Sequence, residues 1–192
     1  MSNYSNGEKV LDIPLSEIDD FPDHPFQVKL DESMQSMVES VKTFGIQTPA
    51  IARLKEDGRY ELVSGHRRKI ACELAGLEVL PCIIRQMSRD EAIIAMVDSN
   101  LQREAILPSE KAKSYKMRYD AMKRQAGRPS KENSVPMGQN FEGKTSRELL
   151  AEKNPDSNTQ IQRFIRLNDL VPEVLQLVDN GKIAMRPAVE LS

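Results

Sequence analysis

The stretch Tyr60-Glu61-Leu62-Val63-Ser64-Gly65-His66-Arg67-Arg68-Lys69-Ile70-Ala71 decides the fold of the first half of this chain. It predicts a strand that ends in a glycine turn and leads into a helix with Arg67 and Arg68 on its first turn. The backbone amides of a helix N-terminus are unpaired and carry roughly half a positive charge, which favours a bound anion. Adjacent guanidinium groups add further positive charge and make the site suitable for a polyphosphate. The pattern therefore predicts a phosphate-binding turn. The alternative is that Gly65 only lets the chain turn and that the basic residues form a solvated helix face.

A second polar cluster, Asp98-Ser99-Asn100-Leu101-Gln102-Arg103-Glu104, ends an apolar helix that we expect to begin near Ser88. Its carboxylate, amide and guanidinium groups suit a hydrated magnesium ion with its phosphates, because magnesium takes a few protein oxygens in addition to those of its substrate. Together the two stretches favour a nucleotide site over the solvated helix face.

The residues around these stretches alternate between predicted strands and predicted helices. Residues 1–9 are polar, and we expect them to be disordered. Apolar spacing predicts a helix from about Asp31 that Gly45 ends, a helix from the glycine turn to about Gly76, and a helix over 90–101. Strands are predicted over 10–15, 49–54, 60–63 and 80–84. These elements predict a small mixed α/β domain over residues 10–104.

The rest of the chain, residues 105–192, contains no convincing strand pattern. Residues 110–125 are strongly helical, and residues 126–144 are rich in Gly, Pro and Ser, which predicts a flexible loop. Two short helices, 145–152 and 159–167, follow on either side of a turn at Asn154-Pro155-Asp156, and further helices are expected over 171–180 and 186–192. The predicted fold class is therefore α+β, with the mixed domain followed by an all-α domain.

The two short helices predict a helix-turn-helix. In the second helix Ile161, Phe164 and Ile165 mark the buried side. Amide and guanidinium side chains are what bidentate recognition of adenine and guanine edges requires. The predicted DNA-binding residues are Ser146, Ser157, Asn158, Thr159, Gln160, Gln162, Arg163 and Arg166. The alternative is an ordinary helical hairpin.

Composition and charge limit the possible functions. The chain has 192 residues, 39% of them apolar, and a net charge of -2. Residues 1–102 carry 11 basic and 17 acidic residues, whereas residues 103–192 carry 16 and 12, so the basic excess is C-terminal. It concentrates in 111–131, where Asp120 is the only acid. Such a run is either a solvated helix face or a surface along a phosphate backbone.

The chain lacks the features of a secreted or membrane protein. No apolar run approaches the roughly 18 residues that a membrane span needs, and the N-terminus lacks a secretory signal. Cys72 and Cys82 lie inside apolar patterns without CxxC spacing, so we expect reduced core residues and a cytoplasmic location.

Four segments resemble the conserved boxes of ParB-type (ParB/Noc-like) partition proteins, and the likeness extends from about Ile13 to Ser192. Gly65 to Ala71 resembles the G-E-R-R-x-R-A box, and Ser99 to Glu104 resembles the E-N-L-Q-R-E box. Leu107 to Ala112 resembles the L-x-P-x-E-x-A helix start, and His24-Pro25-Phe26-Gln27-Val28-Lys29 resembles N-P-x-Q-P-R.

The resemblance implies that the first domain binds CTP and Mg²⁺ and that the second binds a centromere-like parS site. It also implies a homodimer that closes into a sliding clamp, a ParA-type ATPase as partner, and a location on a nucleoid or plasmid. The chain ends before the dimerisation domain with which the family usually continues, so we expect a truncated protein. The residues carried over to the nucleotide are Thr48, Pro49, Gly65, His66, Arg67, Arg68, Asn100 and Arg103, with Gln27 near the reacting phosphate and Asn100 and Asp98 on the metal.

Three departures from the boxes bear on hydrolysis. His66 and Ser99 each replace a Glu, and Val28-Lys29 replaces Pro-Arg. A serine is a poor substitute for a carboxylate that orients water or binds magnesium. Our hypothesis is that CTP binding persists while hydrolysis is weak or uses Asp98, so whether the chain is an enzyme stays open.

Two functions of other classes compete with this interpretation. The first is a helix-turn-helix transcriptional or nucleoid-associated regulator without nucleotide switching. The second is sulfiredoxin-like chemistry, because the N-terminal domain also resembles sulfiredoxin, whose phosphate loop reads Gly-Cys-His-Arg. Here His66 follows Gly65 directly and Cys72 lies about a turn and a half further along the helix.

Overall fold

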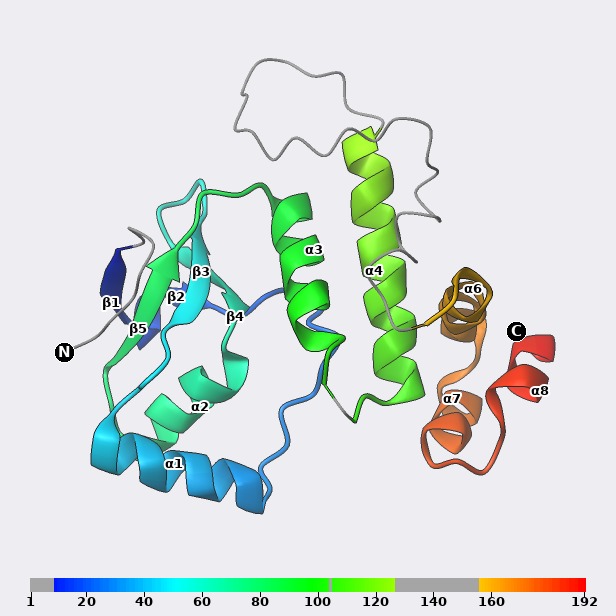
Figure 1. Ribbon diagram of the computed structural model, residues 1–192, viewed down its shortest axis with the longest axis horizontal. Coiled ribbons are helices and arrows are strands. Elements are labelled where there is room, and N and C mark those ends of the chain that lie inside the picture. The colour runs from blue at the N-terminus through cyan, green and yellow to red at the C-terminus, as the bar shows by residue number, and fades with distance from the viewer. Residues whose placement is uncertain (1–8, 104, 127–155) are drawn as a thin grey trace. The chain divides into compact units, whose positions relative to one another are not determined.

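The computed structural model describes residues 9–103, 105–126 and 156–192 (Figure 1). Contacts divide the chain into two compact units, Met1–Ala92 and Ile93–Ser192. The division falls inside helix α3 (Arg89–Asn100), N-terminal to the boundary that we expected after residue 104. The expected loop over 126–144 lies outside the described residues except for residue 126, and so does the expected helix over 145–152.

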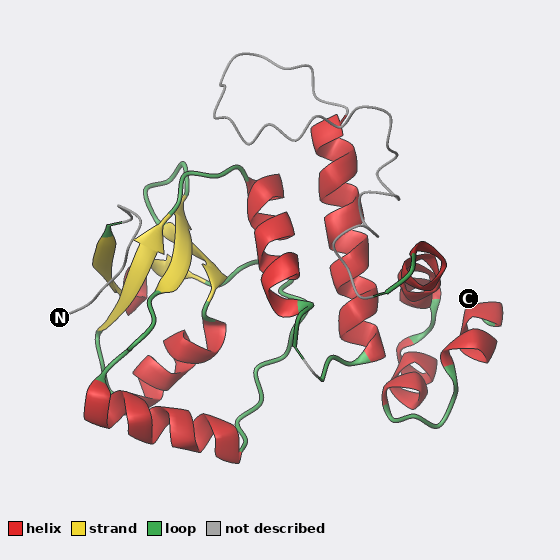
Figure 2. Ribbon diagram, in the orientation of Figure 1, coloured by secondary structure: helices red, strands yellow, loops and turns green. Residues whose placement is uncertain are grey.

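The first unit contains a five-stranded sheet with the order β1-β5-β3-β4-β2 (Figure 2). The pairs β1·β5 and β3·β4 are antiparallel, and the pairs β3·β5 and β2·β4 are parallel. The strands are β1 (Val10–Pro14), β2 (Ile18–Asp19), β3 (Ala50–Leu54), β4 (Tyr60–Ser64) and β5 (Val79–Ile84). All four predicted strands are present, and β2 is an additional one.

Two α-helices pack together beside this sheet, α1 (Glu32–Phe44) and α2 (His66–Ala75) (Figure 1). Asp31 caps α1, because its carboxylate accepts a hydrogen bond from the Met34 amide at 3.0 Å. Gly45, with φ 67°, ends the helix as predicted. A 3-10 turn, η1 (Leu15–Glu17), joins β1 to β2. The core between sheet and helices is made by residues such as Ile13, Ile18, Met34, Val38, Val41, Ala52, Leu62, Ala71, Cys72, Leu80 and Cys82.

The short strand β2 is fixed by ion pairs to residues of the β3–β4 hairpin. Asp19 accepts hydrogen bonds from the Arg59 guanidinium, the shortest at 2.6 Å, and from Lys55 Nζ at 2.8 Å. The hydrogen bonds from Arg59 and then Lys55 hold the pKa of Asp19 well below its usual range. These contacts stabilise a strand that is too short to show a sequence pattern of its own.

The described part of the second unit consists of helices only, which confirms the predicted α+β class. Besides most of α3, its elements are α4 (Pro108–Ala126), α6 (Asn158–Arg166), the 3-10 turn η2 (Leu167–Asp169), α7 (Pro172–Asp179) and α8 (Met185–Glu190). Helix α4 contacts α6, η2 and α7, and α6 contacts α8. Ile161, Phe164 and Leu167 are buried, whereas Ile165 is half-buried. No helix in the described segments has the length and apolar content of a membrane span.

Candidate functional site

Gly65 joins β4 to α2 in a conformation that only glycine adopts readily, with φ 110° and ψ 20°. A Cβ atom at this position would lie 2.8 Å from Ala50 Cβ and 3.3 Å from Ala50 Cα. The turn therefore packs directly against the start of β3. Glycine is required here for its backbone angles and for its lack of a side chain.

Arg68 connects this turn to the segment that precedes β3. Its Nη1 donates hydrogen bonds to the carbonyl oxygens of Thr48 at 2.7 Å and Pro49 at 2.5 Å. The structure thus brings together Thr48, Pro49, Gly65 and Arg68, which the sequence analysis assigned to one site. Arg68 holds backbone carbonyls in place, so its guanidinium braces the site in addition to adding positive charge.

The neighbouring basic residues also make contacts within the first unit. Arg67 Nη2 donates to Ser33 Oγ at 2.8 Å and lies 3.9 Å from Asp31 Oδ1, so it links α2 to the start of α1. Lys69 is buried, and its Nζ pairs with Asp20 Oδ1 at 2.8 Å. Because Arg67 is half-buried and Lys69 is buried, the alternative of a solvated helix face is wrong.

His66, the first residue of α2, contacts the segment that contains Gln27. The imidazole rings of His24 and His66 lie with their centroids 3.8 Å apart. His24 Nδ1 lies 2.8 Å from the carbonyl oxygen of Phe26, and Gln27 follows as an exposed residue. His24 was not among the predicted site residues, because a contact between residues this far apart in the chain leaves no local pattern.

The predicted metal ligands lie in the second unit and are engaged there. Asn100 is buried, and its Nδ2 donates to the carbonyl oxygen of Met96 at 2.8 Å. Asp98 Oδ1 lies 2.8 Å from Nε of Arg118, a side chain that is only 4% exposed. Among the described residues, no group of three or more His, Cys, Asp or Glu side chains could hold a metal ion. Magnesium sites in nucleotide-binding proteins usually take only one or two protein oxygens, and phosphates and water supply the other ligands.

Both cysteines are core residues of the first unit, as predicted. Cys72 and Cys82 are fully buried and unpaired with each other. Burial raises the pKa of the Cys72 thiol and raises the pKa of Cys82 to about 12. A peroxidatic or sulfiredoxin-like reaction needs an accessible thiolate. The geometry therefore argues against the sulfiredoxin-like alternative.

We expect both thiols of the native protein to react with Ellman's reagent at pH 8 at least roughly 100-fold more slowly than those of the unfolded chain, because thiolate is the reactive form and both sulfurs are buried. Raising the pH from 7 to 9 crosses the ordinary thiol pKa of about 8.5, yet the native rate should stay low. Absorbance at 412 nm in guanidinium should report both cysteines. One rapidly reacting thiol in the native protein would contradict this account.

Helix α6, the predicted DNA-reading helix, begins with the expected cap. Ser157 Oγ accepts a hydrogen bond from the Gln160 amide at 3.4 Å. Of the predicted DNA-binding residues, Ser157, Thr159, Gln160 and Arg166 are exposed and Asn158, Gln162 and Arg163 are half-buried. Arg166 Nη2 donates to the Val189 carbonyl oxygen at 3.0 Å, so it also braces α8. Ser146 lies outside the described residues.

The start of α6 is tied to α4 by Asp156. Its Oδ2 accepts hydrogen bonds from Lys111 Nζ at 2.8 Å and from the buried Tyr115 hydroxyl at 2.6 Å. Burial, and next the hydrogen bond to Asp156, raise the pKa of Tyr115 well above its usual value. The ring of Phe164 lies 5.8 Å from that of Tyr115. Helix α6 is therefore held in one orientation on α4.

Part of the basic run is used within the second unit. Lys111 pairs with Asp156, Arg118 pairs with Asp98, and Lys116 pairs with Asp120 at 3.0 Å. Lys113 is exposed. The run is thus neither a uniformly solvated face nor a uniformly available phosphate-binding surface.

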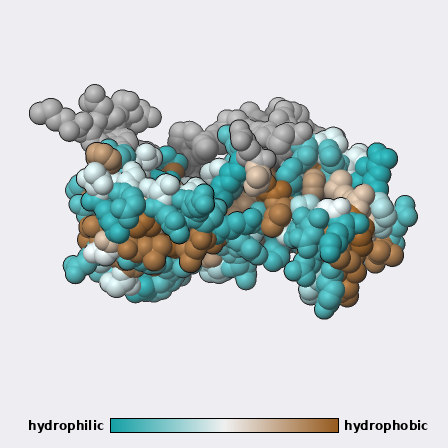
Figure 3. Space-filling model, turned by 90° about the horizontal axis from the view of Figure 1, so that it is seen from below, coloured by the Kyte–Doolittle hydropathy of each residue, from teal (hydrophilic) through white to brown (hydrophobic). Residues whose placement is uncertain are grey.

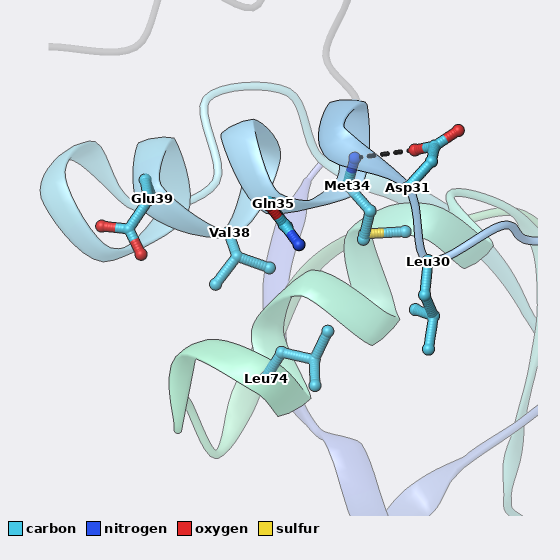
Figure 4. A pocket seen from close by; sticks show the side chains of 7 residues that line it. All are labelled: Leu30, Asp31, Met34, Gln35, Val38, Glu39 and Leu74. Carbon is cyan, nitrogen blue, oxygen red and sulfur yellow. Dashed lines mark hydrogen bonds between the residues drawn. The ribbon is translucent and has the colours of Figure 1, made fainter.

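A hollow of about 320 Å³ lies elsewhere in the first unit, between α1 and the second half of α2 (Figure 4). It is lined by Leu30, Asp31, Met34, Gln35, Val38, Glu39 and Leu74. Figure 3 shows apolar side chains at the surface on the face seen from below, and Leu30, Phe44 and Leu74 are among the exposed apolar residues of the first unit. None of the predicted nucleotide-site residues lines the hollow.

Comparison with solved structures shows the fold of the chain. The C-terminally truncated chromosome-partitioning protein ParB of Caulobacter crescentus, complexed to the centromeric parS site, matches with a TM-score of 0.56 and 21% identity, over 94% of this chain and 83% of the other. A Pnob8-like ParB-N domain matches with a TM-score of 0.58 and 16% identity, over 96% and 79%. At this identity the likeness concerns the fold alone.

Curated relatives and a family model identify the family. The chain is 28% identical to the chromosome-partitioning protein Spo0J of Thermus thermophilus over 177 residues, which cover 92% of this chain and 57% of the relative. It is 31% identical to the stage 0 sporulation protein J of Bacillus subtilis over 181 residues, which cover 93% and 55%. The chain thus spans about half the length of these relatives. The model of the ParB N-terminal domain matches residues 1–101, more than half of the 192. The chain therefore belongs to the ParB N-terminal domain family.

Proposed function

We propose that this chain is a CTP-dependent, site-specific DNA-binding partition protein. The observation that carries the proposal is the turn at Gly65, where Arg68 on the first turn of α2 holds the carbonyl oxygens of Thr48 and Pro49. Family membership supports the same function. In this proposal the first unit binds the nucleotide and the second unit binds a parS-like DNA duplex.

The triphosphate would bind at the first turn of α2. The backbone amides there are unpaired and favour an anion, and Arg67 adds a guanidinium that is 26% exposed. Thr48 and Pro49 would contact the cytosine, and Arg68 would transmit the position of that segment to the turn through its two carbonyl contacts. Base and phosphate recognition would then depend on each other.

Asn100 and Arg103 are assigned to the nucleotide by the resemblance alone. Bound Mg²⁺ would neutralise phosphate charge, and Asn100 would offer it the amide oxygen, since Asn100 Nδ2 donates a hydrogen bond to the Met96 carbonyl oxygen. The Asp98 carboxylate forms an ion pair with the nearly buried Arg118. This pairing does not favour Asp98 as a base that activates water. CTP hydrolysis through Asp98 therefore stays a hypothesis, and Gln27 is the remaining candidate near the reacting phosphate.

DNA recognition would use α6. Its exposed Thr159 and Gln160 are at the N-terminal end, the part of a recognition helix that contacts base edges. Asp156 and the contacts to α4 would hold this end rigid. By family membership we further propose a homodimer that slides as a clamp, a ParA-type ATPase as partner and a location on the nucleoid or a plasmid.

Calorimetric titration of the chain with CTP, ATP, GTP and UTP in the presence of Mg²⁺ tests the proposal. We expect CTP to bind at least about tenfold more tightly than the others, because the site would hydrogen-bond the base. Arg67→Ala should weaken CTP binding at least about tenfold, since a charge-assisted contact to phosphate is lost. The matched control Lys42→Ala removes the same charge from an exposed pair on α1 and should leave affinity unchanged. Absence of heat with every nucleotide would favour a regulator without nucleotide switching.

A further inference from the structure

The two histidines of this chain contact each other at the turn that we assign to the triphosphate. Their ring centroids are 3.8 Å apart and their planes are inclined by 41°. The chain contains no other histidine. Both stand at box positions where the family pattern has another residue, since His24 aligns with the Asn of N-P-x-Q-P-R and His66 with the Glu of G-E-R-R. The two departures thus form one contact.

His24 is oriented by its own segment. A carbonyl oxygen can only accept, so His24 Nδ1 carries the hydrogen in its 2.8 Å contact with the Phe26 carbonyl oxygen. The Phe26 ring, which is buried, meets the His24 ring edge-on at a centroid distance of 5.7 Å. The imidazole of His24 is therefore held from two sides before it meets His66.

His66 is equally constrained from the other direction. It follows Gly65, which packs against Ala50, and it begins α2. The ring contact consequently joins a fixed segment, residues 24–27, to a fixed helix start. Gln27 is the next residue after Phe26, so the same contact determines how far Gln27 lies from the first turn of α2.

We propose that His24 is a positioning residue for triphosphate binding, which acts through the ring of His66 to hold the segment of Gln27 against the first turn of α2. The inference rests on the proposed CTP site. His24 itself does not need to touch the nucleotide. Because the two rings act as one unit, removal of either should have the same consequence as removal of both.

CTP affinity of the full chain in a double-mutant cycle tests this. His24→Ala and His66→Ala should each weaken CTP binding about tenfold, and the double variant should also lose about tenfold, because a single ring pair is removed in all three. A double variant that loses about a hundredfold would show independent contributions and overturn the inference. Phe44→Ala, which removes an exposed ring elsewhere in the first unit, is the matched control.

Rescue and spectroscopy separate positioning from folding. The paired replacement His24→Asn with His66→Glu, which installs the residues of the family boxes, should restore affinity to within about threefold, because an amide can donate to a carboxylate. Because the chain has two histidines, ¹H–¹³C spectra should contain two histidine Cε1–H signals. CTP should shift both in the parent protein, and should leave the His24 signal unmoved in His66→Ala. His24→Gln serves if His24→Ala does not fold.

The outcomes distinguish this inference from the proposed function. If the parent protein binds no nucleotide, the CTP site itself is wrong. If the parent protein binds CTP but folded His24→Ala and His24→Gln bind it within about twofold of the parent, the ring contact does not position the site and the inference is overturned.

Discussion

Gly65→Ala is expected to lower the free energy of unfolding of the first unit by about 3 kcal/mol. A non-glycine residue at φ 110° is strained by about 1–2 kcal/mol. The new Cβ would also lie 2.8 Å from Ala50 Cβ and 3.3 Å from its backbone Cα, and relief of such overpacking costs about 1–3 kcal/mol. The lower entropy of an unfolded alanine chain offsets only about 0.5 kcal/mol of this loss.

The buried cysteines provide a measurement that is specific to this unit. Cys72 and Cys82 both belong to its core, so the urea concentration at which they become reactive reports its unfolding. Gly76→Ala is the matched control, because Gly76 has a positive φ of 76° but nothing within 4 Å of its hypothetical Cβ. We expect Gly76→Ala to cost about 1 kcal/mol. Equal losses for the two variants would show that the packing against Ala50 is not important.

The elements that the sequence predicted correctly are those with local causes. Asp31 and Gly45 bound α1 because capping and a positive φ act within a few residues. The strand, glycine and helix around Gly65 were predicted for the same reason. The strand β2 was missed, because two residues carry no period and their pairing with β4 depends on Asp19, which is held by distant side chains.

The candidate site shows the same division between local and long-range causes. The sequence predicted that Arg67, Arg68 and Lys69 begin a helix, but it could not separate their roles. The Lys69 ammonium group forms an ion pair with Asp20, which lies 49 residues earlier in the chain. Arg68 turns toward carbonyls of another loop. Such roles follow from tertiary packing, which a single sequence does not reveal.

Asp98 was predicted to bind metal or act in hydrolysis, but in the structure its carboxylate forms an ion pair with another residue. Its position next to Asn100 and Ser99 suggested a substitute for the missing Glu. The structure gives its carboxylate to Arg118, which is nearly buried and whose charge has to be neutralised. The sequence showed a polar cluster at the end of α3. It did not show that Asp98 of α3 pairs with Arg118 of α4.

Asp156→Ala is expected to lower the stability of the second unit by about 3 kcal/mol, because it removes the partner of an amine and of a buried hydroxyl at once. The Asp156 side chain is 12% exposed, and it bonds Lys111 and Tyr115 at 2.8 and 2.6 Å. Asp156→Asn keeps an acceptor for the Tyr115 hydroxyl and loses only the charge, so we expect it to cost about half as much. Amide hydrogen exchange of α4 and α6 measures both losses.

A control variant and a DNA-binding measurement test whether the stability of the second unit matters for its function. Asp120→Ala breaks an exposed pair with Lys116 on the same helix and should cost less than about 0.5 kcal/mol. Because Asp156 fixes the start of α6, Asp156→Ala should weaken binding to a duplex selected from random sequences by the parent protein, whereas Asp120→Ala should weaken it far less.

The raised pKa of Tyr115 gives a further signature of the same contact. The pKa of Tyr115 is higher in the folded state than the unfolded value of about 10. Its contribution to stability is therefore fully present below about pH 10 and is lost as the pH rises from there toward the folded-state pKa. In Asp156→Ala the hydrogen bond and the charge of Asp156 are both gone while burial remains, so this alkaline loss should be smaller but still present. An alkaline transition identical to that of the parent would mean that Asp156 does not act on Tyr115, and the pair with Lys111 would then be the remaining polar contact of Asp156 with α4.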